Sequence, residues 1–112
     1  MHLLEVPAEG PPLCGPQDVV DIIGEAFGTR PDWIVIPVAR LDDGVLDLKT
    51  RLLGEMLQKF VNYGFRVALL GDVSAVIAAS KPFADFVRET NRGPQIWFVP
   101  DRETLLARLR AA

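Results

Sequence analysis

Two short polar segments of the sequence combine residue types that could do chemistry. Gly71-Asp72-Val73-Ser74 directly follows the apolar run 65–70, and Glu89-Thr90-Asn91-Arg92-Gly93 precedes the apolar run 95–99. An Asp and a Ser that leave the carboxyl end of a central strand lie where open α/β sheets bind their ligands. Asp72, Ser74, Glu89, Asn91 and Arg92 are therefore the first candidates for an anion-binding or contact site.

Each of these segments also has a purely structural interpretation. Asp72 or Ser74 can cap the next helix by accepting a hydrogen bond from its free N–H groups. A cap beside a helix N-terminus can also bind an anion, so the two interpretations overlap. Arg92 and Gly93 are typical of a helix end, where a cation is favoured by the helix dipole and glycine by the backbone turn.

A second group of polar candidates lies within the segment 46–63. Gln58, Lys59 and Asn62 share the polar side of a strongly amphipathic pattern, which is typical of a solvated helix face and could also form a contact surface. Along the same segment, Asp47, Arg51, Glu55 and Lys59 are spaced by four with alternating sign, as in a row of helical ion pairs.

Composition excludes several classes of function. The 112 residues include one Cys and one His, so an internal disulfide, a Cys/His zinc site and a buried His-based triad are not expected. No G-x-G, Walker or G-x-S-x-G motif is present, so we expect no cofactor, no metal and no catalytic residue set of a known type. A net charge of −3 argues against nucleic acid as a partner. The lack of a long apolar run predicts no membrane insertion, and we expect a cytoplasmic protein.

Hydrophobic patterning predicts one α/β domain over residues 1–112. Apolar, β-branched runs at 33–38, 65–70 and 95–99 predict interior strands. Four helical patterns are present: the first follows Pro16, and the second begins between Leu46 and Thr50 and ends near Tyr63. The third extends from 73 to 91 with a break before Pro82, and the fourth follows Asp101. The alternation predicts a mostly parallel sheet of four or five strands flanked by about four helices. Trp33 and Trp97, within the apolar runs, are expected in the core.

The N-terminal segment 1–16 is rich in Pro and Gly. Its apolar pieces, 3–6 and 12–14, could pair as a hairpin around residues 8–10. A disordered arm is the alternative, because terminal segments fray readily.

Three segments together resemble a known family. Gly54-Glu55-Met56-Leu57-Gln58-Lys59-Phe60-Val61-Asn62-Tyr63 looks like a GE-x-LQKF-x-NY motif, 68–74 resembles a GD-x-S motif, and 85–93 resembles DFI-x-ESNRG. These are motifs of a family of small, mostly bacterial proteins, domain-of-unknown-function family forty-one-eighty, and the similarity extends from about Gln17 to Leu109. Arg51 and Val45-Leu46 depart from the family's usual residues. The resemblance implies no established activity.

A second similarity concerns the order of elements. With an N-terminal hairpin, that order is similar to the STAS and SpoIIAA-like domains, in which the loop before a helix carries a phosphorylated Ser or Thr. The similarity implies Thr50 as a phosphoacceptor, because a phosphate there would lie at a helix N-terminus. It also implies a non-enzymatic regulatory or protein-interaction module whose partner is another protein, with a homodimer as one form of it. The alternative is a small-molecule, anionic-ligand binder or an unrecognised enzyme that uses 71–74 with Asn91 and Arg92.

Overall fold

Four short apolar runs form a fully parallel sheet in the computed structural model, which describes residues 1–111. The strands are β1 (Leu3–Glu5), β2 (Trp33–Pro37), β3 (Val67–Leu70) and β4 (Ile96–Val99), and they lie side by side in that order. Val35 pairs with Glu5 on one side and with Ala68 on the other, and Ala68 pairs with Trp97. The predicted single α/β domain with a parallel sheet of four or five strands is thus confirmed.

Five α-helices connect and cover these strands within residues 1–111. They are α1 (Val20–Thr29), α2 (Leu52–Asn62), α3 (Ser74–Ala79), α4 (Lys81–Asn91) and α5 (Arg102–Ala111). The predicted break before Pro82 separates α3 from α4, and the hydroxyl oxygen of Ser80 accepts the backbone N–H of Phe83 at 3.2 Å to cap the second helix. No helix in the described residues is both long and apolar enough to cross a bilayer.

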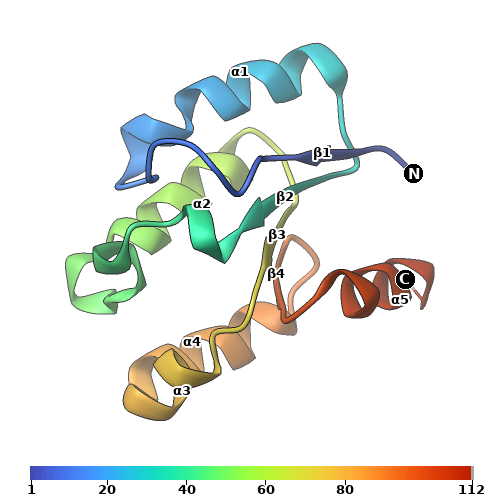
Figure 1. The fold of residues 1–112 in the computed structure, drawn as a ribbon. Helices are drawn as coiled ribbons and strands as arrows, with labels where there is room; N and C mark the ends of the chain where they lie inside the picture. The colour runs from blue at the N-terminus through green and yellow to red at the C-terminus, as the bar shows by residue number, and fades with distance from the viewer. Residues whose placement is uncertain (112) are drawn as a thin grey trace.

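The two faces of the sheet are covered unequally. Helices α1 to α4 lie on one face, whereas α5 alone lies on the other (Figure 1). Along β2, Ile34 and Ile36 point into the larger core, and Trp33 and Val35 point toward α5, as the period of two in a strand requires. Trp33 and Trp97 are both buried, as predicted, with ring centroids 4.1 Å apart.

The N-terminal segment 1–16 does not form the expected hairpin. β1 instead pairs in parallel with β2, and Leu13 forms a single parallel bridge with Leu41. The intervening loop is attached to the domain by Arg40, whose guanidinium donates to the carbonyl oxygens of Pro7 at 2.9 Å and Pro11 at 2.7 Å. The sequence offered apolar pieces that can pair with each other. The first piece pairs with β2 and the second bridges to Leu41 outside the sheet, and Val6 and Leu13 are buried in the main core.

The long helix α2 begins at Leu52, later than the predicted start between Leu46 and Thr50. Two 3₁₀ turns precede it, and in each an aspartate, Asp42 or Asp47, accepts a backbone N–H two residues ahead. Arg51 then takes a left-handed conformation with φ 63°, which breaks the path of the chain. Asp47 and Arg51 therefore lie outside the helix, and the expected row of four alternating charges does not form.

Candidate functional site

The segment Gly71–Ser74 lies at the carboxyl end of β3, as predicted. A Cβ at Gly71 would come within 2.9 Å of the Cβ of Val38, so this turn needs glycine for close approach as well as for its φ of 150°. Asp72 accepts the backbone N–H of Ser74, the first residue of α3, at 2.9 Å. Hydrogen bonding from Ser74 lowers the pKa of Asp72 below its usual range. This aspartate therefore stabilises the turn that starts α3.

A small hollow of about 160 Å³ adjoins this turn. It is lined by Gly71–Ser74, Val87 and Phe98–Pro100, and neither Asn91 nor Arg92 lines it. The volume is below the roughly 300–1,000 Å³ of small-molecule sites. The structure thus does not assemble the two polar segments around one pocket.

Asn91 is occupied by contacts within the fold. Its side-chain oxygen accepts a hydrogen bond from the backbone N–H of Phe98 at 2.6 Å, and its carbonyl oxygen accepts one from the guanidinium of Arg108. The same guanidinium lies 3.8 Å from the centre of the Trp97 ring, whose indole N–H donates to the carbonyl of Gly93 at 2.9 Å. Because β4 is an edge strand, Asn91 satisfies an N–H that no neighbouring strand pairs.

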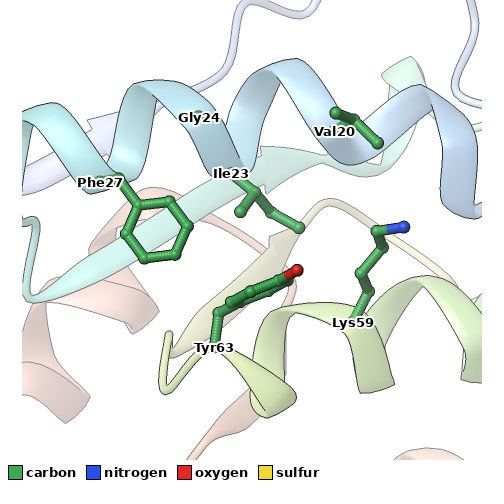
Figure 2. Close-up of a pocket in the computed structure, with 6 residues that line it drawn as sticks. All are labelled: Val20, Ile23, Gly24, Phe27, Lys59 and Tyr63. Carbon is green, nitrogen blue, oxygen red and sulfur yellow. The ribbon is translucent and has the colours of Figure 1, made fainter.

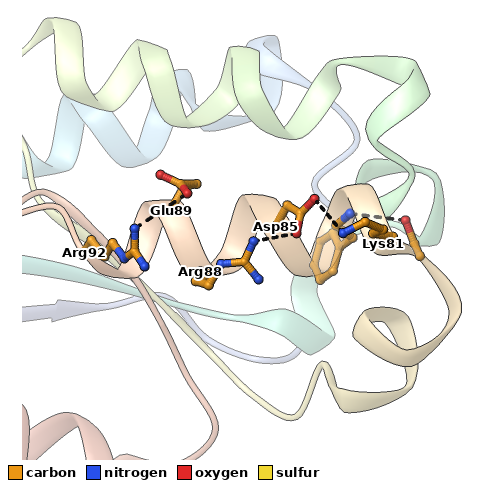
Figure 3. Close-up of polar contacts among 7 residues, drawn as sticks. Lys81, Asp85, Arg88, Glu89 and Arg92 are labelled. Carbon is orange, nitrogen blue, oxygen red and sulfur yellow. Dashed lines mark hydrogen bonds and ion pairs between the residues drawn. The ribbon is translucent and has the colours of Figure 1, made fainter.

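Glu89 and Arg92 belong to a row of exposed charges along α4. Figure 3 shows Lys81, Asp85 and Arg88 in sequence, followed by Glu89 and Arg92. Arg88 contacts Asp85 at 2.6 Å, and Arg92 contacts Glu89 at 3.8 Å. The hydrogen bond from Arg88 lowers the pKa of Asp85. Solvent reaches both partners of each pair, so this row is a solvated helix face whose ion pairs contribute little to stability.

The polar residues of α2 separate into two groups. Gln58 donates to the side-chain oxygen of Asn62 at 2.8 Å, one turn along the exposed face. Gln58 also borders a shallow hollow of about 470 Å³ between α2 and α4, which is lined as well by Gly54 and Phe86. Lys59 lies on the other side of the helix, next to α1. The motif carried by α2 therefore contributes to two different surfaces.

The hydroxyl of Thr50 closes the turn before α2. It donates to the carbonyl oxygens of Asp47 at 2.8 Å and Gly44 at 3.2 Å, and it accepts the N–H of Leu52 at 3.3 Å. Thr50 is exposed and lies two residues before Leu52, the first residue of α2. Phosphorylation would remove the single hydroxyl proton that these two carbonyl oxygens share.

An apolar groove lies between α1 and α2, which we call the α1–α2 groove. Its volume is about 280 Å³, and its lining residues are Val20, Ile23, Gly24, Phe27, Lys59 and Tyr63. Figure 2 shows Phe27 and Tyr63 facing each other at one end, and Lys59 reaching up toward α1 at the other. The rings of Phe27 and Tyr63 meet edge to face with centroids 5.3 Å apart. The groove is therefore a formed depression with aromatic and cationic walls.

Large apolar side chains are exposed around this groove. Val20 is 40%, Phe27 43% and Tyr63 53% exposed, and the fourth exposed large apolar residue of the described chain is Met1. In the sequence, Phe27 continues the apolar repeat of Ile23 and Ala26 at helical spacing, and the period alone does not tell the centre of an apolar stripe from its edge. The stripe is centred on Ile23 and Ala26, which are buried, and Phe27 lies at its margin. Of the groove residues, sequence reasoning had singled out Lys59 alone as a contact candidate.

Metal-ligating groups do not converge in residues 1–111. No group of three or more His, Cys, Asp or Glu side chains is placed to hold a metal ion there. The polar candidates lie on separate elements and bond mainly to their own turns and helices. The surface that stands out is apolar, and apolar surface binds other apolar surface.

The fold and this surface together define a single-domain, parallel α/β protein with an exposed apolar groove between two helices on one face. A model of the family described as Domain of unknown function (DUF4180) matches residues 1–109, so the chain belongs to that family. The family resemblance of the three sequence motifs is thereby confirmed. Neither a curated protein nor a solved structure was found to match the chain.

Proposed function

We propose that this protein is a non-enzymatic interaction module that binds a protein partner through the α1–α2 groove. The carrying observation is that Val20, Phe27 and Tyr63, three of the four exposed large apolar residues of the described chain, surround one depression. Single exposed apolar residues are common, whereas clustered ones mark contact sites. Burial of these side chains by a partner would release water from apolar surface and drive association.

The proposal does not depend on a STAS-like regulatory role. That finer expectation rested on an N-terminal hairpin, and β1 pairs with β2 instead. Phosphorylation of Thr50 stays a separate prediction. Intact mass measurements on the protein from its natural host would reveal an added phosphate, and its absence under several growth conditions would contradict the prediction.

Binding of an anionic small molecule is the weaker alternative. The hollow beside Asp72 is small, and the negative charge of this lining residue would repel an anion. Asn91 has its side-chain oxygen bonded to Phe98. No contact in the described residues favours this alternative over the groove.

Site-specific photo-crosslinking in the natural host tests the proposal. A photoreactive amino acid at position 24 would lie in the groove, and a Cβ at Gly24 meets no atom within 4 Å, so the fold should tolerate it. We expect protein adducts from position 24 and none from a matched probe at Glu103, which is exposed on α5 across the sheet. Failure of position 24 to give protein adducts would contradict the proposal.

A further inference from the structure

The charges around the α1–α2 groove are arranged in a self-complementary way. Lys59 is the one charged residue that lines the groove, and no carboxylate within residues 1–111 forms an ion pair with it. On the solvent side of α1, Asp21 and Glu25 are exposed, and α1 contains no Lys or Arg from Val20 to Thr29. One surface therefore presents an unpaired cation on one wall and carboxylates on the outside of the other.

The shape of α1 also permits close approach by another helix. Gly24 lies between Val20 and Phe27 on the groove side, and a Cβ there would meet no atom outside the neighbouring helix backbone within 4 Å. Glycine in a helix interior is destabilising relative to alanine, and no packing within the described chain requires a glycine here. Without a side chain at this position, a second backbone can approach closely between the two apolar residues.

We infer that the groove is occupied by α1 of a second copy of this chain, packed antiparallel across a two-fold axis near Gly24. This inference rests on the function proposed above and names its partner. A two-fold contact uses the same patch twice, so the Lys59 side of each copy meets the acidic side of the other copy's α1. Phe27 of each copy then lies toward Val20 of the other, and both sets of exposed apolar side chains are covered.

The contact is short, which sets its expected strength. A helix of ten residues is about 15 Å long, so the buried area falls at the low end of specific interfaces. We therefore expect a dimer that dissociates on dilution, and association must be measured over a wide range of concentrations.

Sedimentation equilibrium of the purified protein is the first test. We expect a concentration-dependent monomer–dimer equilibrium in the wild type. Gly24→Glu should raise the dissociation constant at least about 100-fold, because it adds bulk and places two carboxylates against each other at the axis. Gly54→Glu is the matched control: Gly54 is also a helical glycine whose Cβ meets no atom within 4 Å, on the opposite side of α2. An unchanged dimer in Gly24→Glu would overturn the inference.

Charge reversal gives a second test, in which association is restored by mixing two variants, a result that unfolded variants could not produce. Lys59→Glu alone and Asp21→Lys/Glu25→Lys alone should each be monomeric, since each opposes like charges across the axis. An equimolar mixture of the two variants should form a heterodimer, because both halves of the interface then pair opposite charges. Failure of the mixture to associate would contradict the antiparallel arrangement.

The outcomes separate this inference from the proposed function. Adducts from position 24 with the mass of two chains support both. Adducts of position 24 with a different protein, together with a wild-type chain that stays monomeric, overturn the inference and leave the proposed function standing. A monomeric chain without adducts overturns both.

Discussion

Two regions of the molecule use their side chains in opposite ways: the α1–α2 groove, and the contacts of Asn91, Trp97 and Arg108 around β4, which we call the end of β4. At the end of β4, Asn91, Trp97 and Arg108 satisfy one another and the neighbouring backbone through internal hydrogen bonds and ring contacts. In the groove, Phe27 and Tyr63 remain about half exposed. Polar residues that look functional in the sequence are thus engaged by the fold, and apolar residues that look like core remain available to a partner.

This difference predicts that stability and association can be lost separately. Substitutions at the end of β4 should lower the free energy of unfolding and leave the dimer of the folded protein intact. Substitutions in the groove should abolish association with little loss of stability. A variant at the end of β4 that stays fully folded and yet fails to dimerise would break the comparison.

The largest effect is expected for Asn91→Ala. It removes the acceptor of the Phe98 N–H at the part-buried edge of β4, and such an unsatisfied group costs about 1–3 kcal/mol. Chemical denaturation should show this loss as a lower midpoint with an unchanged slope. Asn62→Ala is the matched control, because Asn62 is also the last residue of its helix but bonds only to an exposed glutamine. Equal losses in the two variants would contradict the edge-protecting role of Asn91.

A smaller loss is expected for Arg108→Ala. The guanidinium donates to the carbonyl of Asn91 and stacks 3.8 Å from the Trp97 ring centre, contacts that together contribute about 1–2 kcal/mol. Tryptophan fluorescence should also change, because the cation leaves the face of one indole. Arg110→Ala, two residues further along the same helix, should change neither the midpoint nor the emission if Arg108 acts through these contacts.

Gly24→Ala should change stability in the opposite direction. Alanine fits the helix better than glycine by about 0.5–1 kcal/mol, and its Cβ would enter open space in the monomer. We expect a higher unfolding midpoint when measured at concentrations where the protein is monomeric, together with weaker dimerisation. Gly64→Ala serves as the contrasting control, since its φ of 80° strains any residue with a Cβ. Stronger dimerisation in Gly24→Ala would argue against close helix approach at this position.

Much of the fold could be predicted because its determinants are local or periodic. The apolar runs around Trp33, Val67 and Trp97 correctly predicted three strands, although β4 lies at an edge of the sheet and not in its interior. Pro82 correctly marked the break between α3 and α4. The partner of the N-terminal segment could not be predicted, since pairing within the segment and pairing with β2 bury similar side chains. The decisive contact, Arg40 with the Pro7 and Pro11 carbonyls, joins residues about thirty positions apart and has no local pattern.

The candidate site was predicted less well for a related physical reason. Residue type shows that Asn91 can form hydrogen bonds, but only the fold shows that the Phe98 N–H already occupies its oxygen. Likewise, helical period identifies the apolar stripe of α1 but not how far α2 covers it. The pattern of α2 alone indicates that Lys59 is polar and accessible, but its position across from Val20 depends on how α1 packs beside α2.

The smallest effect concerns the exposed ion pair between Glu5 and Arg102, which extends the polar contacts of the α5 face to β1. The hydrogen bonds from Arg102 lower the pKa of Glu5 below its usual range. A carboxylate with a lowered folded-state pKa stabilises the fold above its unfolded pKa of about 4.3, and that stabilisation is lost as pH falls through the lower folded value. Glu5→Gln should therefore lower the unfolding midpoint slightly at neutral pH and flatten its acid dependence, while dimerisation stays unchanged. Because solvent screens this pair, Glu5→Gln should lower the unfolding midpoint less than Arg108→Ala does. A larger decrease would mean that the ion pair between β1 and α5 stabilises the domain more than the contacts of Arg108 do.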